Sequence, residues 1–271
     1  MTEILLLGAT GGTGKNILRL LVQNSNYSIK LLVRDIERAK KTLTSEYSSI
    51  TEDDLKKIKL IQGSITESNL SSEIFDVDLI IHTAATHGRD SKQTEYEVAY
   101  EGMKNIIKHS KQSKKLKKII YVTSGFVTRP FHPVALILNT IARNSLKWKL
   151  EAENVLRESG IPYVICRPAG GLSDETLDAP IEFGVGDKIS GTPTSRVSVA
   201  ECVIKCIELD MNNITFEMIN NPKKEKTDWK EMTSLSKDTE ITIKRNHDLP
   251  FYLIYTITIG AIGFMVKKYF F

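Results

Sequence analysis

Three glycines near the N-terminus have the spacing that suits a nucleotide phosphate. Gly8, Gly11 and Gly14 form a G-x-x-G-x-x-G pattern, and Gly12 adds a fourth glycine. The first glycine lets the chain turn sharply, the middle pair lets the backbone approach a pyrophosphate, and the last lets a helix pack closely on a strand. Such a turn also forms for purely local reasons, so it indicates phosphate binding only between a strand and a helix.

Both of these elements are indicated by the sequence. Residues 4–7 are a short apolar run before the turn, and residues 16–22 follow it with helical spacing. The N-terminus of that helix would offer free N–H groups and a positive dipole end to phosphates. The segment therefore predicts a dinucleotide site whose cofactor-binding residues are Gly8, Thr10, Gly11, Gly12, Thr13 and Gly14.

The rest of the chain supplies the strands and helices that would position this turn. Further apolar strands are predicted at residues 28–33, 59–62, 77–82, 118–123, 162–166 and 214–219. Helices are predicted between them at residues 36–43, 92–112, 134–159 and 197–209. Continuously apolar strands that alternate with helices predict an α/β protein with a doubly wound parallel sheet, the Rossmann fold. Ligands of such sheets bind beyond the carboxyl ends of the strands.

Composition narrows the class of protein. The 271 residues, 41% of them hydrophobic, suit one large domain, and the formal net charge is only +4. Aromatic residues do not interleave with basic ones, so nothing favours nucleic-acid binding. The lysines within residues 111–118 suit a solvated helix end and loop better than an anionic-surface patch. Cys166, Cys202 and Cys206 lack metal-ligand spacing, so we expect buried thiols. The small number of cysteines and the lack of a signal-peptide pattern indicate a reducing compartment.

Several segments together resemble one known family. They are the GATGGTG turn, LVRD at residues 32–35, the small-residue end of the fourth strand, YVTS at residues 121–124, and residues 153–168. In this order, over about residues 3–220, the chain resembles the atypical branch of the short-chain dehydrogenase/reductase family, the NAD(P)-binding proteins similar to NmrA. The resemblance implies a Rossmann fold with a bound nicotinamide dinucleotide.

The expected cofactor is NADP, with NADPH preferred over NADH. Arg34 follows the second strand, where NAD-binding folds commonly have an acidic residue, and an arginine there suits the 2′-phosphate. Alternatively, Arg34 is a surface residue paired with Asp35 or Glu37. Ser64 stands where the family has an acidic residue at the adenine. The resemblance also places five further residues at the cofactor: Thr83, Ala84, Ala85, Arg167 and Pro168.

The catalytic set that the resemblance implies is incomplete. In the family, a serine ends the fifth strand, and a Tyr-x-x-x-Lys pair on the next helix supplies the acid/base and holds the nicotinamide ribose. Ser124 matches that serine, and Lys149 matches the lysine, although it could instead form a helix salt bridge with Glu153. The tyrosine position is Ser145, and no tyrosine lies within residues 122–162. A serine hydroxyl is a much weaker acid than a phenol, whose pKa is about 10, so the usual proton transfer is compromised.

The C-terminal part changes composition abruptly. Residues 223–248 are polar, which predicts a linker with a helix near Trp229 to Leu235, after a dinucleotide-binding domain at residues 1–222. Residues 249–266 carry no charge, and as a helix they would be about 27 Å long. That length suits a membrane anchor at residues 249–268, and a terminal core helix or strand is the alternative. The expected location is a mitochondrial membrane or, alternatively, the cytosolic face of the endoplasmic reticulum.

Two functions fit these features. The first is a membrane-anchored NADPH-dependent oxidoreductase that passes hydride to a lipophilic, quinone or flavin-type acceptor. The second is a non-catalytic nucleotide-binding subunit or assembly factor of a membrane complex, which the serine at position 145 favours. Both need the dinucleotide, so the glycine turn does not separate them.

Overall fold

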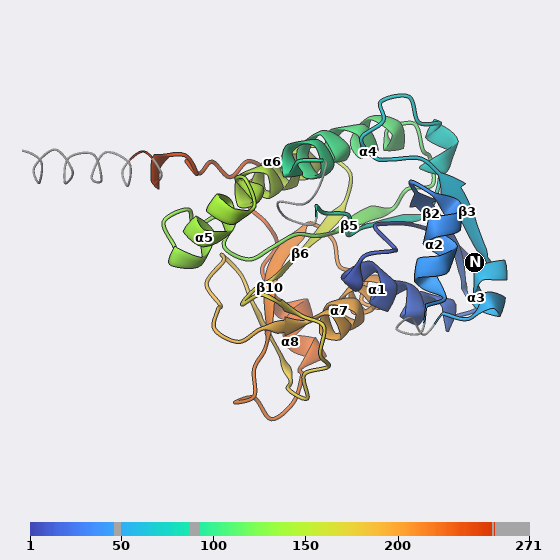
Figure 1. Ribbon diagram of the computed structural model, residues 1–271. Coiled ribbons are helices and arrows are strands. Elements are labelled where there is room, and N and C mark those ends of the chain that lie inside the picture. Colours follow the sequence, from blue (N-terminus) through green and yellow to red (C-terminus); the bar gives the residue numbers. More distant parts are fainter. Residues whose placement is uncertain (46–49, 87–92, 251, 253–271) are drawn as a thin grey trace, which may run out of the picture.

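One eight-stranded sheet forms the centre of the protein (Figure 1). The computed structural model describes residues 1–45, 50–86, 93–250 and 252. The strand order is β3-β2-β1-β4-β5-β6-β10-β8, and all neighbours are parallel except β8, which runs antiparallel to β10. The strands are β1 (Thr2–Leu7), β2 (Tyr27–Val33), β3 (Ile58–Gln62), β4 (Leu79–His82), β5 (Lys118–Val122), β6 (Tyr163–Pro168), β8 (Ile181–Gly184) and β10 (Ile214–Asn220). The predicted doubly wound α/β fold is confirmed, with β8 as an unforeseen edge strand.

Helices cover both faces of this sheet (Figure 1). α1 (Gly12–Val22), α2 (Ile36–Leu43) and α7 (Arg196–Glu208) pack on one face, while α4 (Gly102–Ser110) and α6 (Ser145–Glu158) pack on the other. The strand β1 shows why its sequence is apolar throughout. Ile4 and Leu6 join the first core, whereas Leu5 and Leu7 join the second, because successive side chains point to opposite faces.

Shorter elements complete the connections between these layers. They are α3 (Glu52–Lys56), the 3-10 turn η1 (Ser72–Ile74), the π-helical η3 (Tyr96–Glu101), α5 (Pro133–Ile141), α8 (Trp229–Ser234) and a two-stranded sheet of β7 (Leu172–Ser173) and β9 (Thr194–Ser195). The helix α8 confirms the helix predicted near Trp229.

The single helix predicted at residues 134–159 is wrong, because two helices occupy that stretch. α5 ends at Ile141 and α6 begins at Ser145, and Arg143 and Asn144 between them have φ angles of 51° and 61°. An α-helix cannot continue through two left-handed residues. The buried Asn139 side chain accepts a hydrogen bond from the Leu146 amide at 3.0 Å and so satisfies the new N-terminus.

Residues 235–248, which we call the C-terminal strap, are docked along α6. Asn154 pairs with the backbone of Ile243 in both directions, at 2.9 and 3.0 Å. The buried His247 ring lies between Asn139, at 3.0 Å, and the carbonyl of Val127, at 2.8 Å. The segment predicted as a linker therefore contacts the sheet domain closely, and the boundary at residue 222 stays a prediction.

The predicted membrane anchor at residues 249–268 lies, apart from residues 249, 250 and 252, outside the described part of the chain. Within the described part, we find no helix with the length and apolar character that crossing a bilayer demands.

Candidate functional site

The glycine turn after β1 is tightly constrained by packing. Gly8 has a φ of +86°, and a Cβ there would lie 2.6 Å from the Ala84 amide nitrogen. A Cβ on Gly14 would lie 2.1 Å from the carbonyl oxygen of Gly8, so the start of α1 packs directly against the glycine-rich segment. Both positions require glycine for the reasons that the sequence pattern predicts.

The end of β4 holds this turn in place. The Thr83 amide donates to the Leu7 carbonyl at 2.9 Å, and its hydroxyl donates to the same oxygen at 3.0 Å. Thr83 and Ala84 therefore pack against the glycine turn. The expected contact of Thr83, Ala84 and Ala85 with the cofactor stays a prediction. The first intrahelical bond of α1 runs from Lys15 to Gly11, so the earlier amides of the helix have no intrahelical acceptor. This arrangement can receive an anionic group.

A chain of polar side chains joins the two residues expected at the adenosine end of the cofactor. Arg34 Nη1 donates to Gln93 Oε1 at 3.5 Å, and Gln93 Nε2 donates to Thr66 Oγ1 at 3.0 Å. The hydroxyls of Thr66 and Ser64 are 2.9 Å apart. Asp35, the alternative partner of Arg34, caps α2 by accepting from the Arg38 amide at 2.9 Å. Arg34 and Ser64 thus belong to one hydrogen-bonded group at the ends of β2 and β3.

Lys149 is paired with a carboxylate that sequence reasoning missed. Its Nζ lies 3.3 Å from Oε1 of the buried Glu95, whose other oxygen accepts from the Thr86 amide at 3.2 Å. The expected alternative, a pair between Lys149 and Glu153, is wrong, because Glu153 binds two arginines instead. No short-range pattern marks Glu95, since 54 residues separate it from Lys149.

The structure places Ser124 just after β5, beside the loop that follows β6. The Gly125 amide donates to the Pro168 carbonyl at 2.8 Å, so the two loops are adjacent. Ser145 is buried at the start of α6, one helical turn before Lys149. Ser145 and Lys149 thus lie on the same side of α6, as the expected i,i+4 pairing requires, and their roles in a reaction stay predictions.

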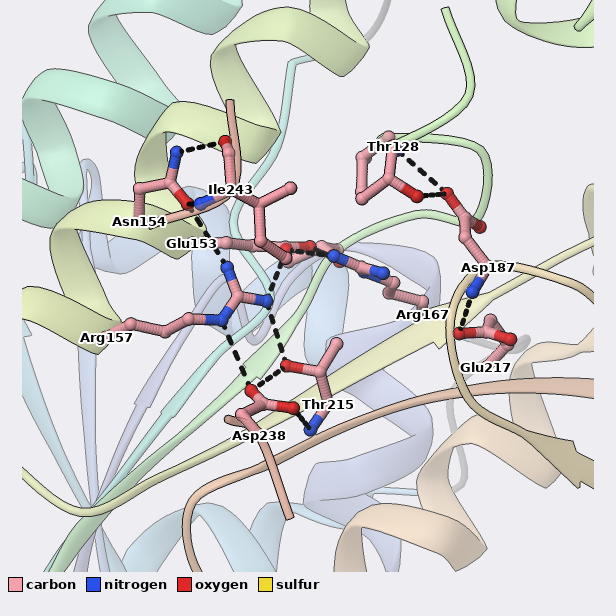
Figure 2. A network of polar contacts seen from close by, with 12 residues as sticks. Thr128, Glu153, Asn154, Arg157, Arg167, Asp187, Thr215, Glu217, Asp238 and Ile243 are labelled. Carbon is pink, nitrogen blue, oxygen red and sulfur yellow. Dashed lines mark hydrogen bonds and ion pairs between the residues drawn. The ribbon is translucent and has the colours of Figure 1, made fainter. Parts of the chain in front are cut away.

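Arg167 lies in the core rather than on a loop surface, and Figure 2 shows its guanidinium facing Glu153. Arg167 Nε donates to Glu153 Oε1 at 3.0 Å, and Arg157 Nη2 donates to Glu153 Oε2 at 2.9 Å. Burial alone would raise the pKa of Glu153, but the charges of Arg167 and Arg157 outweigh it and hold that pKa below its ordinary value. This pairing gives Arg167 a structural role, and its contact with the cofactor remains a prediction.

A second buried acidic pair fixes the loop that carries Ser124 (Figure 2). Asp187 accepts hydrogen bonds from the amides of Phe126, at 2.6 Å, and Thr128, at 2.8 Å. Its own amide donates to Glu217 at 2.6 Å, and burial raises the pKa of the Glu217 carboxyl. The loop after β5 is therefore held by the Asp187 side chain, and Glu217 of β10 fixes the backbone of Asp187 in turn.

Other polar and sulfur groups belong to the core. His82 is fully buried, stacks on Tyr121 with ring centroids 4.8 Å apart, and has a pKa lowered to about 3 by burial. Cys166, Cys202 and Cys206 are buried free thiols, as predicted. Among residues 1–45, 50–86, 93–250 and 252, no group of His, Cys, Asp and Glu side chains could hold a metal ion.

Comparison with known proteins agrees with this geometry. The sequence profile of the NAD(P)H-binding family matches residues 8–210, from the glycine turn to the end of α7. The chain belongs to the NAD(P)H-binding family. This membership confirms the predicted resemblance to NmrA-like, atypical short-chain dehydrogenase/reductase proteins and establishes a nicotinamide dinucleotide as the cofactor class.

Several curated relatives come from plants. An uncharacterized chloroplast protein of Arabidopsis thaliana is 27% identical over 212 residues, which cover 76% of this chain and 71% of that protein. Protein TIC 62 of the Arabidopsis thaliana chloroplast is 29% identical over 78% of this chain and 35% of its own length. Sanguinarine reductase of Eschscholzia californica is 33% identical over 49% of each chain. The chain thus spans less than half of the last two proteins.

Solved structures share the fold at low sequence identity. An NAD-dependent epimerase/dehydratase-like protein from Bacillus halodurans has a TM-score of 0.67 and 19% identity, over 86% of this chain and 98% of its own. A short-chain dehydrogenase/reductase of Veillonella parvula in complex with NADP has a TM-score of 0.62 and 18% identity, over 83% and 99%. An anaerobilin reductase of Escherichia coli has a TM-score of 0.65 and 20% identity, over 82% and 99%.

These comparisons correct the expected location. The relatives that match three quarters of the chain are chloroplast proteins, and the described residues hold no helix that could span a membrane. The prediction of a mitochondrial membrane, or of the endoplasmic reticulum, is therefore wrong.

Proposed function

We propose that the protein is an NADPH-dependent reductase that passes hydride to a quinone or flavin-type acceptor. The observation that carries the cofactor choice is the polar chain from Arg34 to Ser64, at the ends of β2 and β3. A guanidinium held in this place suits the 2′-phosphate that distinguishes NADPH from NADH. The reductase names among its relatives and structural neighbours agree with a reductive reaction.

The acceptor class follows from the residue at position 145. Reduction of an isolated carbonyl needs an acid to protonate the oxygen as hydride arrives, and the buried Ser145 is too weak an acid for that task. A quinone or flavin takes the hydride, with its two electrons, to give a stabilised anion. Water can then supply the proton, and NADP⁺ leaves as the oxidised product. Ser124 would orient the acceptor, and Lys149 would hold the nicotinamide ribose.

The second candidate is a non-catalytic dinucleotide-binding subunit. The pairing of Lys149 with Glu95 favours it, because a lysine held by a buried carboxylate is less available to a ribose. Such a protein would bind the cofactor with the same glycine turn and the same Arg34, but it would not oxidise NADPH.

Two measurements test the proposal. NADPH and NADH are titrated against wild type and Arg34→Ala, with the exposed Lys41→Ala on α2 as the matched loss of a positive charge. We expect a preference for NADPH that falls roughly tenfold or more in Arg34→Ala alone, as loss of charge-assisted hydrogen bonds predicts. Equal affinities of wild type for the two cofactors would show that Arg34 does not read the 2′-phosphate.

The second measurement is NADPH oxidation with a panel of quinones, flavins and simple carbonyl compounds. Turnover limited to quinones and flavins supports the proposed acceptor class. Tight NADPH binding without any turnover supports the non-catalytic subunit instead.

A further inference from the structure

A second arginine lies over the first residue of α1. A Cβ built on Gly12 would be 2.7 Å from both Cδ and Nε of Arg196, and 3.3 Å from its Cζ. Arg196 is the first residue of α7, and α1 and α7 pack side by side beneath the sheet (Figure 1). A side chain at Gly12 would displace the flexible end of Arg196, and the guanidinium lies close to the N-terminus of α1.

The present partner of Arg196 is weakly held. Nη1 of Arg196 lies 2.7 Å from Oδ1 of Asp174, just after β7. The Asp174 side chain is 85% exposed, whereas the Arg196 side chain is 23% exposed. A solvated carboxylate is a weak partner for an arginine, so another anion can replace it at little cost.

We propose that Arg196 binds the pyrophosphate of the dinucleotide and gives up Asp174 when the cofactor enters. The inference rests on the proposed cofactor function. A guanidinium offers paired N–H donors in the fork that phosphate oxygens accept, and the amides at the start of α1 add further donors. The two arginines would then recognise different phosphate groups of the cofactor. Arg34 recognises the 2′-phosphate, which only NADP(H) has, and Arg196 recognises the pyrophosphate, which NAD(H) and NADP(H) share.

This division can be tested with two fragments of the cofactor. ADP carries the pyrophosphate without a 2′-phosphate, and 2′-AMP carries the 2′-phosphate without a pyrophosphate. We expect Arg196→Ala to weaken ADP, NADH and NADPH by the same factor, roughly tenfold or more, and to leave 2′-AMP unchanged. Arg34→Ala should do the reverse, weakening 2′-AMP and NADPH only. Asp174→Ala removes the competing carboxylate, so it should bind ADP and NADPH a few-fold more tightly.

A double-mutant comparison tests the contact between Gly12 and Arg196. The methyl group of Gly12→Ala would displace the Arg196 side chain, so Gly12→Ala should weaken ADP binding in wild type and weaken it less in Arg196→Ala. If Arg196→Ala does not fold, Asp174→Ala alone still has to tighten ADP binding. Wild type and Arg196→Ala binding ADP equally would overturn the proposal while leaving the cofactor function intact. Wild type binding neither ADP nor NADPH would overturn both.

Discussion

At the scale of single residues, Glu153 links the helix α6 to the sheet. Its carboxylate is fully buried between Arg157 and Arg167, and it also accepts a hydrogen bond from Thr123 at 2.8 Å. The net benefit of a buried pair is small, because desolvation offsets the attraction, but removal of one member leaves the other charges uncompensated. Loss of Glu153 would therefore destabilise the fold mainly by leaving the buried charges of Arg157 and Arg167 without a counter-charge.

We predict that Glu153→Gln lowers the free energy of unfolding at pH 7 by about 3–5 kcal/mol. The folded-state pKa of Glu153 lies below its ordinary value of 4.5, so its contribution is complete above that value and is lost as the pH falls through the folded pKa. Urea unfolding at pH 7 and at progressively lower pH should show the difference from wild type shrinking below pH 4.5. Glu225→Gln, at an exposed position, should change little.

The residue scale is also where sequence reasoning was least complete. The glycine turn, Thr83 and Ser124 could be placed because each follows an apolar strand. Glu95 and Arg196 could not, because their partners, Lys149 and Gly12, are brought near only by the packing of helices. Tertiary pairs of this kind leave no periodic signal in the chain.

At the scale of elements, the continuously apolar strands were predictable from the sequence, whereas the edge strand β8 and the break between α5 and α6 were not. Strand β8 is four residues long, has alternating burial and lies in a polar region, so it gives a weak signal. The break between α5 and α6 falls at Arg143 and Asn144, without the glycine or proline that usually marks a helix end. The hydrogen bond from Asn139 to α6 fixes the break, and it depends on the folded geometry.

This break gives a prediction about backbone strain. Arg143 has a φ of 51°, a conformation that costs a residue with a Cβ about 1–2 kcal/mol. Arg143→Gly and Arg143→Ala both remove the side chain, but only glycine removes the strain. We expect the glycine variant to be the more stable of the two by about 1 kcal/mol in chemical denaturation. Equal stabilities would indicate that the αL conformation at this residue is not strained.

At the scale of the whole molecule, the C-terminal strap is part of the domain's polar core. Asp238 lies 3.2 Å from Arg157 Nε and accepts from the Tyr163 hydroxyl at 2.9 Å, as Figure 2 shows for the arginine. His247 and Ile243 satisfy Asn139 and Asn154 in the same way. Without the strap, the buried side chains of Asn139, Asn154 and Arg157 would lose these hydrogen-bond partners. Each buried polar group left without a partner costs roughly 1–3 kcal/mol of stability.

The strap predicts the outcome of two truncations. A chain ending at residue 252 keeps the strap, whereas a chain ending at the predicted boundary, residue 222, loses it together with α8. We expect the shorter chain to unfold at a clearly lower temperature, or to fail to fold, because Arg157 loses Asp238 and Asn154 loses Ile243. Similar melting temperatures for the two would instead support a complete domain at residues 1–222.

The position of the strap along the chain also bears on synthesis. Asn154 lies 89 residues before Ile243, and Asn139 lies 108 residues before His247. The chain emerges from the ribosome N-terminus first, so α6 emerges long before the strap that supplies its hydrogen-bond partners. The glycine turn and the strands beside it can assemble early, but the polar side of α6 must wait for nearly the last described residues to leave the ribosome.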